Sequence, residues 1–297
     1  MEDSTGHLKI HLRGMGEDCR INKYELYHYI ENIIVSDELS ERITEEIWNS
    51  KILSEGINLD INELYNYIIK YDKKKAVRFK NVYKYKTGVA SGKIKNPLII
   101  IIGGCAGSGK TTIAIELSRR LGLKYVGGGF TRDILQICIP QKLFPIMYEH
   151  TYTAYKATNN PFISKNRVLY SYIEQSTIMS NCINMLIDKA TIQGTHLILE
   201  GGFILPQILK LNRHILHFIQ AIQNDKLIIQ RIKSTLTSTH LKRPIQKDDI
   251  LNVSRINDYL IKSALENDVN VVFNDGTIED TLNTVLDLLA EKINEIV

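Results

Sequence analysis

Apolar residues recur along the first part of the chain at the spacing of amphipathic helices. Three successive segments show this spacing, and their apolar positions are Leu26, Ile30 and Ile33, then Leu39, Ile43 and Ile47, then Ile61, Leu64 and Ile68. Steps of three and four residues place side chains on one face of a helix. Asp60 precedes the third segment, and Ser36 the second, at positions suited to helix N-caps. We therefore predict a small helical bundle, preceded by a hairpin near residues 8–20.

A basic run follows the predicted bundle. Residues 73–95 contain nine Lys or Arg and no Asp or Glu, while Ala76, Phe79 and Tyr83 keep helical spacing. Such a run is either the solvated face of a last helix or a surface that meets phosphates, and a charge cluster alone favours the first interpretation. The small residues of 87–92 predict a flexible boundary. We predict a small, mainly helical domain over residues 1–90 and a second domain over residues 91–297.

The second domain opens with a phosphate-binding pattern. Residues 97–102 form a short, largely β-branched run, typical of a buried central strand in a parallel sheet. The next segment, from Gly104 to Thr111, matches G-x-x-x-x-G-K-[ST] at every fixed position. A helix with Ala114, Leu117 and Leu121 on one face follows it. A strand, a glycine-rich loop and a helix in this order predict a P-loop that binds ATP.

Each residue type in this loop has a physical role. The glycines allow backbone N–H groups to surround the β-phosphate, and the N-terminus of the following helix favours an anion. Lys110 places a positive charge beside the β- and γ-phosphate oxygens, and the Thr111 hydroxyl is a ligand for Mg²⁺. The predicted nucleotide-binding residues are Gly104, Gly107, Ser108, Gly109, Lys110, Thr111 and Thr112.

A second apolar strand, Leu197 to Leu199, ends in the carboxylate of Glu200. Ligands of doubly wound sheets bind at the carboxyl ends of the strands. We therefore expect Glu200 to hold the Mg²⁺ hydration shell or to orient a nucleophile, the alternative being a surface carboxylate at a turn. One long helix over residues 166–190 lies between the two strands. The predicted fold class is α/β, with a parallel sheet flanked by helices.

Basic residues gather again between positions 231 and 255, as in the mobile lid of a phosphotransferase. They are Arg231, Lys233, His240, Lys242, Arg243 and Arg255. Positive charge is needed where the γ-phosphoryl group moves, and lid cations such as Arg231 and Arg243 are expected to supply it. A strand over residues 269–273 leads into a turn over residues 274–277. This turn either lies beside the adenine or is a plain capped turn.

The composition of the chain restricts the class of protein and the partners to be expected. The 297-residue chain is 44% hydrophobic and 24% charged, as globular proteins are. Its net charge of +4 does not favour a nucleic acid or a membrane surface as a partner. The four cysteines are scattered and the first residues are polar, so we expect a cytoplasmic protein with reduced thiols. The sequence leaves the oligomeric state open.

The second domain resembles the archaeal 2-phosphoglycerate kinases, which have a nucleotide-kinase-like P-loop fold. The resemblance lies in the loop and in the segments 99–104, 131–135, 152–156, 199–206 and 255–260. The first domain resembles an ATP-cone, the small helical module that precedes the kinase domain in that family. The resemblance implies an ATP-dependent small-molecule kinase that uses Mg²⁺. Its expected acceptor is 2-phosphoglycerate, and its expected product is 2,3-bisphosphoglycerate.

The resemblance also identifies Arg132 with the arginine that grips the substrate phosphate. Taken together, the motifs and the resemblance define a set of expected catalytic residues. They are Lys110, Arg132, Glu200, Arg231 and Arg243, and the expected metal-binding residues are Thr111 and Glu200.

One segment departs from the family pattern. The family reads Thr-Asp-Ser-Ile-Arg where this chain reads Gly-Gly-Phe-Thr-Arg at residues 128–132. Gly129, or Gly128 if the register slips, therefore stands where the family has the aspartate that orients the acceptor. Two alternatives to the family reaction stay open. One is a nucleotide-responsive regulatory ATPase that touches nucleic acid through residues 73–95, and the other is a nucleoside monophosphate kinase.

Overall fold

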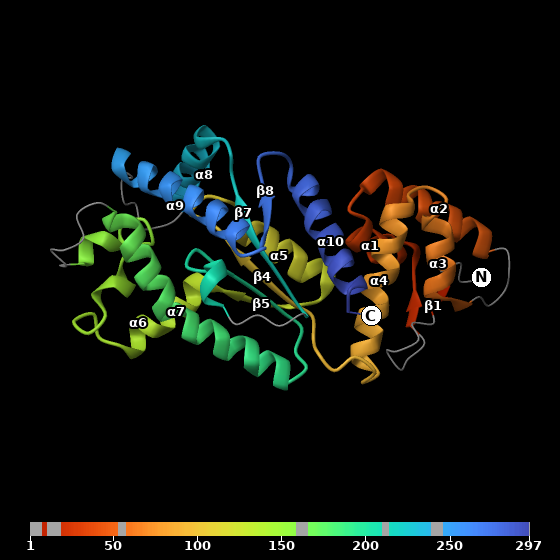
Figure 1. The fold of residues 1–297 in the computed structure, drawn as a ribbon. Coiled ribbons are helices and arrows are strands. Elements are labelled where there is room, and N and C mark those ends of the chain that lie inside the picture. Colours follow the sequence, from red (N-terminus) through yellow and green to blue (C-terminus); the bar gives the residue numbers. More distant parts are fainter. Residues whose placement is uncertain are drawn as a thin grey trace. The chain divides into compact units, whose positions relative to one another are not determined.

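The structure, a computed structural model of the chain, describes residues 8–10, 19–52, 58–158, 166–209, 214–238 and 246–296 (Figure 1). The chain divides into two units. Met1–Pro97 and Leu282–Val297 together form the N-terminal unit, and Leu98–Thr281 form the P-loop unit. The sequence predicted one boundary between residues 90 and 91. The structural division differs in the position of that boundary and in assigning the C-terminal segment to the first unit.

Short strands pair within the N-terminal unit. β1 (Leu8–Ile10) pairs antiparallel with β2 (Cys19–Ile21) and parallel with β3 (Asn58–Leu59). The first pairing confirms the hairpin predicted near residues 8–20, whose connecting residues 11–18 lie outside the described part of the chain. β3 is too short to produce a periodic pattern, so the sequence did not predict it.

The predicted helices of the N-terminal unit are confirmed. They are α1 (Lys23–Ile34), α2 (Asp37–Ile52), α3 (Ile61–Ile68) and, over the basic run, α4 (Lys73–Ala90). Leu26, Ile43 and Leu64 are fully buried, as their helical spacing requires. Asp60 caps α3, because its carboxylate accepts from the Glu63 N–H while the Glu63 carboxylate accepts from the Asp60 N–H.

The basic run of α4 packs within its own unit. Lys74 Nζ lies 2.8 Å from Asp287 Oδ2, the Lys80 ammonium lies 4.6 Å from the centre of the Tyr65 ring, and Arg78 is buried. These contacts support the interpretation of the run as part of a last helix, and not as a surface that binds phosphates. The prediction of a flexible boundary over residues 87–92 is wrong for its first part, because α4 continues to Ala90.

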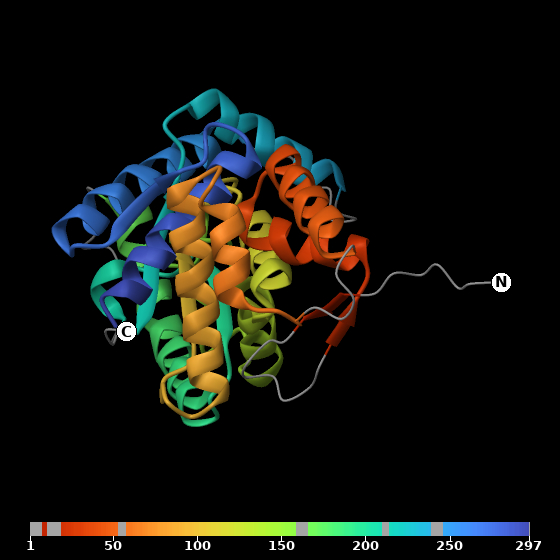
Figure 2. The ribbon, with the colours of Figure 1, turned by 90° about the vertical axis from the view of Figure 1, so that its right-hand side faces the viewer.

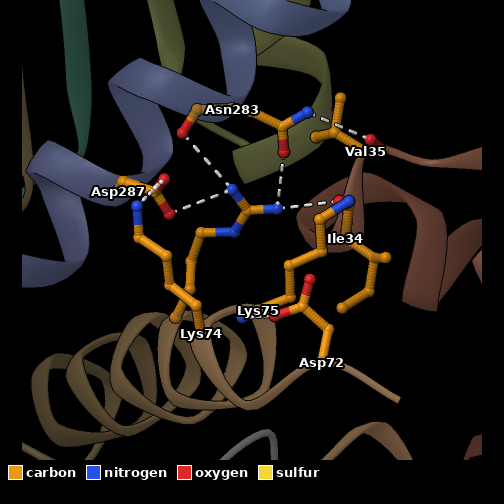
Figure 3. Close-up of polar contacts among 8 residues, drawn as sticks. Ile34, Val35, Asp72, Lys74, Lys75, Asn283 and Asp287 are labelled. Atoms are coloured by element: carbon orange, nitrogen blue, oxygen red, sulfur yellow. Dashed lines mark hydrogen bonds and ion pairs between the residues drawn. The ribbon is translucent and has the colours of Figure 1, made fainter.

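Arg78 joins α4 to the C-terminal helix α10 (Ile278–Asn294), and the two helices lie side by side (Figure 2). Arg78 Nη2 donates to the Ile34 carbonyl at 2.7 Å and to Asn283 Oδ1 at 2.9 Å. Its Nη1 donates to the Asn283 carbonyl and to Asp287 Oδ1, both at 3.3 Å. In Figure 3, Asn283 and Asp287 reach from α10 toward this guanidinium. The charge therefore lies among acceptors from two helices, α1 and α10.

Arginine suits this position because its planar guanidinium carries several donors in fixed directions and stays charged. Asn283 adds a further bond, from its Nδ2 to the Val35 carbonyl at 3.3 Å. Both α10 residues lie beyond Thr281, where the P-loop unit ends. These long-range polar bonds hold the C-terminal segment in the N-terminal unit.

The P-loop unit contains a parallel sheet with the strand order β5-β6-β4-β7-β8. Its strands are β4 (Ile99–Gly103), β5 (Lys124–Gly127), β6 (Leu197–Gly201), β7 (Ile215–Ala221) and β8 (Asn270–Phe273). Every residue of β4, β6 and β7 is buried, which explains why apolar residues dominate these strands. The predicted parallel sheet is confirmed.

Helices flank this sheet. They are α5 (Lys110–Leu121), α6 (Gly128–Cys138), α7 (Arg167–Ile192), α8 (Asp225–Ser238) and α9 (Lys247–Glu266), with short 3-10 turns at Pro145–Tyr148, Ala154–Ala157 and Pro206–Ile208. Met179 and Ile183 of α7 pack with Ile101 and Leu199 of the sheet in one core cluster. The α/β fold class is therefore confirmed. Among the described helices, none has the length and apolar character needed to cross a membrane.

Replacing Arg78 by Lys should destabilise the protein by on the order of 3 kcal/mol, because buried acceptors would lose their donor. The matched control is Lys74→Ala, which removes an exposed partner of the same Asp287 and should cost less than about 1 kcal/mol. Urea unfolding of both full-length variants measures the difference. Equal stability losses would show that the Arg78 bonds do not hold the unit together.

His217, on β7 beside Ile101, should make the protein sensitive to acid. Burial lowers its pKa from the ordinary value of 6.5 to about 4, and neither ring nitrogen has a hydrogen-bond partner among the described atoms. The unfolded chain therefore takes up a proton near pH 6.5 that the folded chain resists. Stability from this source is complete above pH 6.5 and falls by about 3 kcal/mol as the pH drops toward 4. His217→Leu should remove that slope from pH-dependent unfolding curves, and an unchanged slope would contradict the assignment.

Candidate nucleotide-binding site

The loop between β4 and α5 has a backbone that glycine alone accommodates. Gly104, Gly107 and Gly109 have φ angles of 149°, 78° and 88°. A Cβ at Gly104 would lie 2.3 Å from the Gln220 carbonyl oxygen, and a Cβ at Gly109 would lie 2.4 Å from Asn274 Nδ2. The loop therefore turns tightly against the strand ends behind it, and α5 begins at Lys110 directly after it. This is the anion-binding geometry that the sequence pattern predicted.

Lys110 lies inside the loop. Its side chain is buried, and its Nζ donates to the Cys105 carbonyl at 2.7 Å. The ammonium thus bonds to the loop's own backbone at the start of α5, where the helix dipole also favours an anion. An incoming phosphate would meet a fixed positive charge and free helix N–H groups at the same place.

Thr111 and Glu200 meet, as expected of a shared metal site. Thr111 Oγ1 lies 3.3 Å from Glu200 Oε1, and the Tyr125 hydroxyl donates to the same oxygen at 3.1 Å. Glu200 is buried at the end of β6. Burial, followed by the charge and hydrogen bond of Glu200, raises the pKa of Tyr125 to about 12, so Tyr125 stays a neutral donor. The alternative of a surface carboxylate at a turn is wrong, because Glu200 is 6% exposed.

These two oxygen donors fit Mg²⁺. The ion prefers oxygen ligands and commonly takes only one or two of them from the protein, with waters and phosphate oxygens completing its shell. The part of the chain that the structure describes contains no cluster of three or more His, Cys, Asp or Glu side chains, as a fully protein-bound metal would need. Thr111 and Glu200 could therefore supply the protein ligands of a Mg²⁺ ion that takes its other ligands from water and phosphate oxygens.

A cleft of about 740 Å³ opens in front of the loop. Most of the predicted site residues line it, namely Gly107, Gly109, Lys110, Thr111, Thr112, Arg132, Glu200 and Arg231. Gly104 and the fully buried Ser108 belong to the same loop behind it. Arg243 lies in residues 239–245, outside the described part of the chain, so its role stays a prediction. Among the described residues of the cleft wall, Glu200 is the only carboxylate.

Arg132 projects from α6 into the cleft wall. Its Nη1 donates to the Glu149 carbonyl at 3.3 Å, and Gln175 Nε2 donates to the same carbonyl at 3.0 Å. Burial lowers the pKa of the Arg132 guanidinium, since no carboxylate close by fully offsets its desolvation. Its Nε is buried without a hydrogen-bond partner among the described atoms. A cation with an unused donor favours an anionic ligand at this wall of the cleft.

The two glycines of the Gly-Gly-Phe-Thr-Arg segment differ in the space around them. A Cβ at Gly128 would lie 2.6 Å from the Glu200 carbonyl oxygen and 2.7 Å from the Phe203 ring, so no side chain fits there. A Cβ at Gly129 would have nothing within 4 Å, and Gly129 lines the cleft. Gly129 is therefore the position where a side chain could reach an acceptor. It lies three residues before Arg132 and thus on the same face of α6.

The predicted lid is only partly within the described residues. Arg231, on α8, lines the cleft, and its Nη1 would lie 3.5 Å from a Cβ at Gly109. Burial lowers the pKa of Arg231, with Asp275 opposing the shift. Lys233 is exposed and Arg255 donates to Asn252 Oδ1 at 3.5 Å, and neither lines this cleft.

Sequence reasoning missed several polar residues behind the loop. Gln220 Nε2 and Asn274 Nδ2 both donate to the Ser108 carbonyl at 2.8 Å, and Asn257 Nδ2 donates to the Ile222 carbonyl at 2.8 Å. The signal for Gln220 was a polar residue inside the apolar run of β7. The turn at residues 274–277 was left with two interpretations, and the structure supports the capped turn, because Thr277 and Asp280 cap each other.

Comparison with known proteins finds relatives that are named as kinases. No family model matches the chain. The chain is 30% identical over 209 residues to the 2-phosphoglycerate kinase of Pyrococcus furiosus, an alignment that covers 69% of this chain and 68% of that protein. It is 28% identical to the enzyme of that name from Methanopyrus kandleri and 27% identical to that of Methanocaldococcus jannaschii, covering 68% of this chain each time. The chain spans 63% and 66% of the length of these two relatives.

Among solved structures, a shikimate kinase from Acinetobacter baumannii matches 68% of this chain with 16% identity and a TM-score of 0.37, which is too low to bear on function. The sheet order, the loop and the cleft define a P-loop domain of the nucleotide-kinase type. The chain belongs to the 2-phosphoglycerate kinase family.

The two neighbouring glycines should respond differently to the same substitution. Gly128→Ala should lower stability by about 1–3 kcal/mol, because the methyl group would overlap the β6 backbone. Gly129→Ala should leave stability unchanged or raise it by up to about 1 kcal/mol, since it adds a better helix former in open space. Thermal unfolding of the pair measures this. A Gly128→Ala protein as stable as the wild type would contradict the close packing at Gly128.

Proposed function

We propose that this protein transfers the γ-phosphoryl group of ATP to 2-phosphoglycerate and forms 2,3-bisphosphoglycerate. The charge of the cleft is the observation that carries the proposal. Lys110, Arg132 and Arg231 line the cleft, and the carboxylate of Glu200 is the only one among its described residues. This surplus of positive charge favours two anionic ligands, ATP and a small acceptor that itself carries a phosphate and a carboxylate. The membership of the 2-phosphoglycerate kinase family supports the same acceptor.

The proposed role of each residue follows from its position in the cleft. The loop and Lys110 bind the β- and γ-phosphates, and Arg231 faces them from α8. Arg132, on α6, lines the cleft and holds the acceptor's phosphate through its unused guanidinium donor. Thr111 and Glu200 would hold Mg²⁺, which neutralises phosphate charge when bound. We infer that the arrangement acts mainly by positioning and by charge.

The loss of the acceptor's hydroxyl proton is the step at which this chain differs from the family pattern. Forming 2,3-bisphosphoglycerate joins the C3 hydroxyl oxygen to the γ-phosphorus, breaks the bond to the β–γ bridging oxygen and releases ADP and the hydroxyl proton. Glu200 already accepts hydrogen bonds from Thr111 and Tyr125, and position 129 has no carboxylate. In the P-loop unit, the undescribed segments 159–165, 210–213 and 239–245 contain no Asp or Glu either. We infer that the proton leaves late, after the new P–O bond has formed, as a loose transition state allows.

The test is ADP release by the full chain with ATP, Mg²⁺ and a panel of acceptors. The panel contains 2-phosphoglycerate, 3-phosphoglycerate, AMP and a single-stranded oligonucleotide. The proposal expects fast release only with 2-phosphoglycerate, and phosphorus NMR should show the new phosphate on C3. Stimulation by AMP would indicate a nucleoside monophosphate kinase, and stimulation by the oligonucleotide a regulatory ATPase. Either result would overturn the proposal.

A Gly129→Asp protein in the same assay should turn over faster, because it regains a proton acceptor.

Replacing Arg132 by Lys should raise the KM for 2-phosphoglycerate about tenfold or more while changing the KM for ATP little, because lysine cannot reproduce the two-pronged contact with a phosphate. The matched control is Arg119→Lys on the exposed face of α5, which should change neither constant. Equal increases in both Michaelis constants would place Arg132 at the nucleotide instead.

A further inference from the structure

The peptide between Ser108 and Gly109 is held from behind by two buried amides. Gln220 Nε2 and Asn274 Nδ2 each donate to the Ser108 carbonyl at 2.8 Å. Gln220 is fully buried and Asn274 nearly so, and they come from the adjacent ends of β7 and β8. The Asn274 N–H also donates to the Ala221 carbonyl at 3.0 Å, which ties the two strand ends together. Both donors of this pair are therefore fixed by the sheet.

Holding that carbonyl also fixes the N–H on the other side of the same peptide. A trans peptide is planar, and its C=O and N–H point in opposite directions. With the Ser108 oxygen directed at the two amides, the Gly109 N–H points away from them. Gly109 has a φ of 88° and lines the cleft, so this N–H belongs to the group that would contact phosphate. The absence of a side chain at Gly109 lets Asn274 approach this closely.

The orientation of the Asn274 amide depends on α10. Thr281 Oγ1 donates to Asn274 Oδ1 at 2.9 Å, and Thr281 is 2% exposed in the first turn of that helix. The Ser108 carbonyl can only accept, so Asn274 must present its NH₂ group to the loop and its oxygen to Thr281. The Thr281 hydroxyl then serves as the donor that fixes this choice. Hydrogen bonds in such a chain strengthen one another in a buried place.

The hydrogen bonding of the Gln220 amide also indicates a role in orienting the loop. Its Oε1 is buried without a hydrogen-bond partner among the described atoms, while its Nε2 is bonded to the loop. An unsatisfied buried oxygen lowers stability, and an apolar side chain at this position of β7 would avoid that cost. The glutamine is therefore explained by the bond that its NH₂ group makes to Ser108.

We propose that Gln220, Asn274 and Thr281 are positioning residues for nucleotide binding, which orient the Ser108–Gly109 peptide so that its N–H contacts the nucleotide phosphates. The inference rests on the proposed function only in requiring ATP at the loop, and it is independent of the acceptor. It predicts that a hydroxyl on α10 sets the affinity of the loop for phosphate, although its partners among the described residues are Asn274 and the Thr277 carbonyl.

The test compares three variants of the full chain by calorimetric titration with Mg·ADP and Mg·ATP. Thr281→Val keeps the shape and removes the hydroxyl, and it should weaken binding of both nucleotides about tenfold. Thr281→Ser keeps the hydroxyl and should bind like the wild type. Thr284→Val makes the same change on the exposed face of α10 and should also bind like the wild type. The thermal unfolding temperature and the KM for 2-phosphoglycerate are measured for each.

The expected pattern is weakened nucleotide binding in Thr281→Val alone, with an unchanged KM for 2-phosphoglycerate. Unchanged binding in Thr281→Val, or equal weakening in Thr281→Ser, would overturn the proposal. If Thr281→Val does not fold, Gln220→Leu replaces it, and unchanged nucleotide binding in that variant would overturn the proposal in the same way. Wild-type protein that binds ATP but phosphorylates no acceptor would contradict the proposed function and leave this inference standing.

Discussion

A short stretch of backbone must turn its N–H groups toward one point, and much of the P-loop unit serves that constraint. Three loop glycines take φ angles between 78° and 149°, which other residues rarely adopt. Besides its own bonds to the Cys105 carbonyl, the loop is supported by the elements that surround it. The buried strand β4 leads into it, α5 begins at its end, and the amides of Gln220 and Asn274 hold it from behind. The phosphate site is thus built from four elements.

Burial also affects the charged residues of the cleft. Burial lowers the pKa of both Arg132 and Arg231, which means that the folded chain keeps these cations at the expense of their hydration. Only one carboxylate among the described cleft residues opposes them, and it is bonded to Thr111 and Tyr125. A cleft arranged in this way is more stable with anions inside it than without them. Ligand binding is therefore expected to stabilise the P-loop unit against unfolding.

The sequence predicts what depends on local pattern. The β-branched run before Gly104, the loop itself and the helical spacing of Leu26, Ile30 and Ile33 led to correct elements, because each signal lies within a few residues. The meeting of Thr111 with Glu200 was also predictable, since the carboxyl ends of parallel strands share one edge. The role of Arg78 was not, because its partners on α10 lie more than 200 positions away. The difference between the open space at Gly129 and the crowded position of Gly128 was not predictable either. It depends on Glu200 and Phe203, which lie about 70 positions away in the sequence and pack against Gly128.

The position of α10 has a consequence for how the protein is made. The N-terminal unit contains both ends of the chain, and Arg78 takes acceptors from helices α1 and α10 together. During synthesis the first helices leave the ribosome long before Asn283 and Asp287 exist. Until then the Arg78 guanidinium lacks most of its partners, so the N-terminal unit begins to appear before the P-loop unit and is completed after it. The helices made before the P-loop unit gain these bonds only once the entire P-loop unit has been translated.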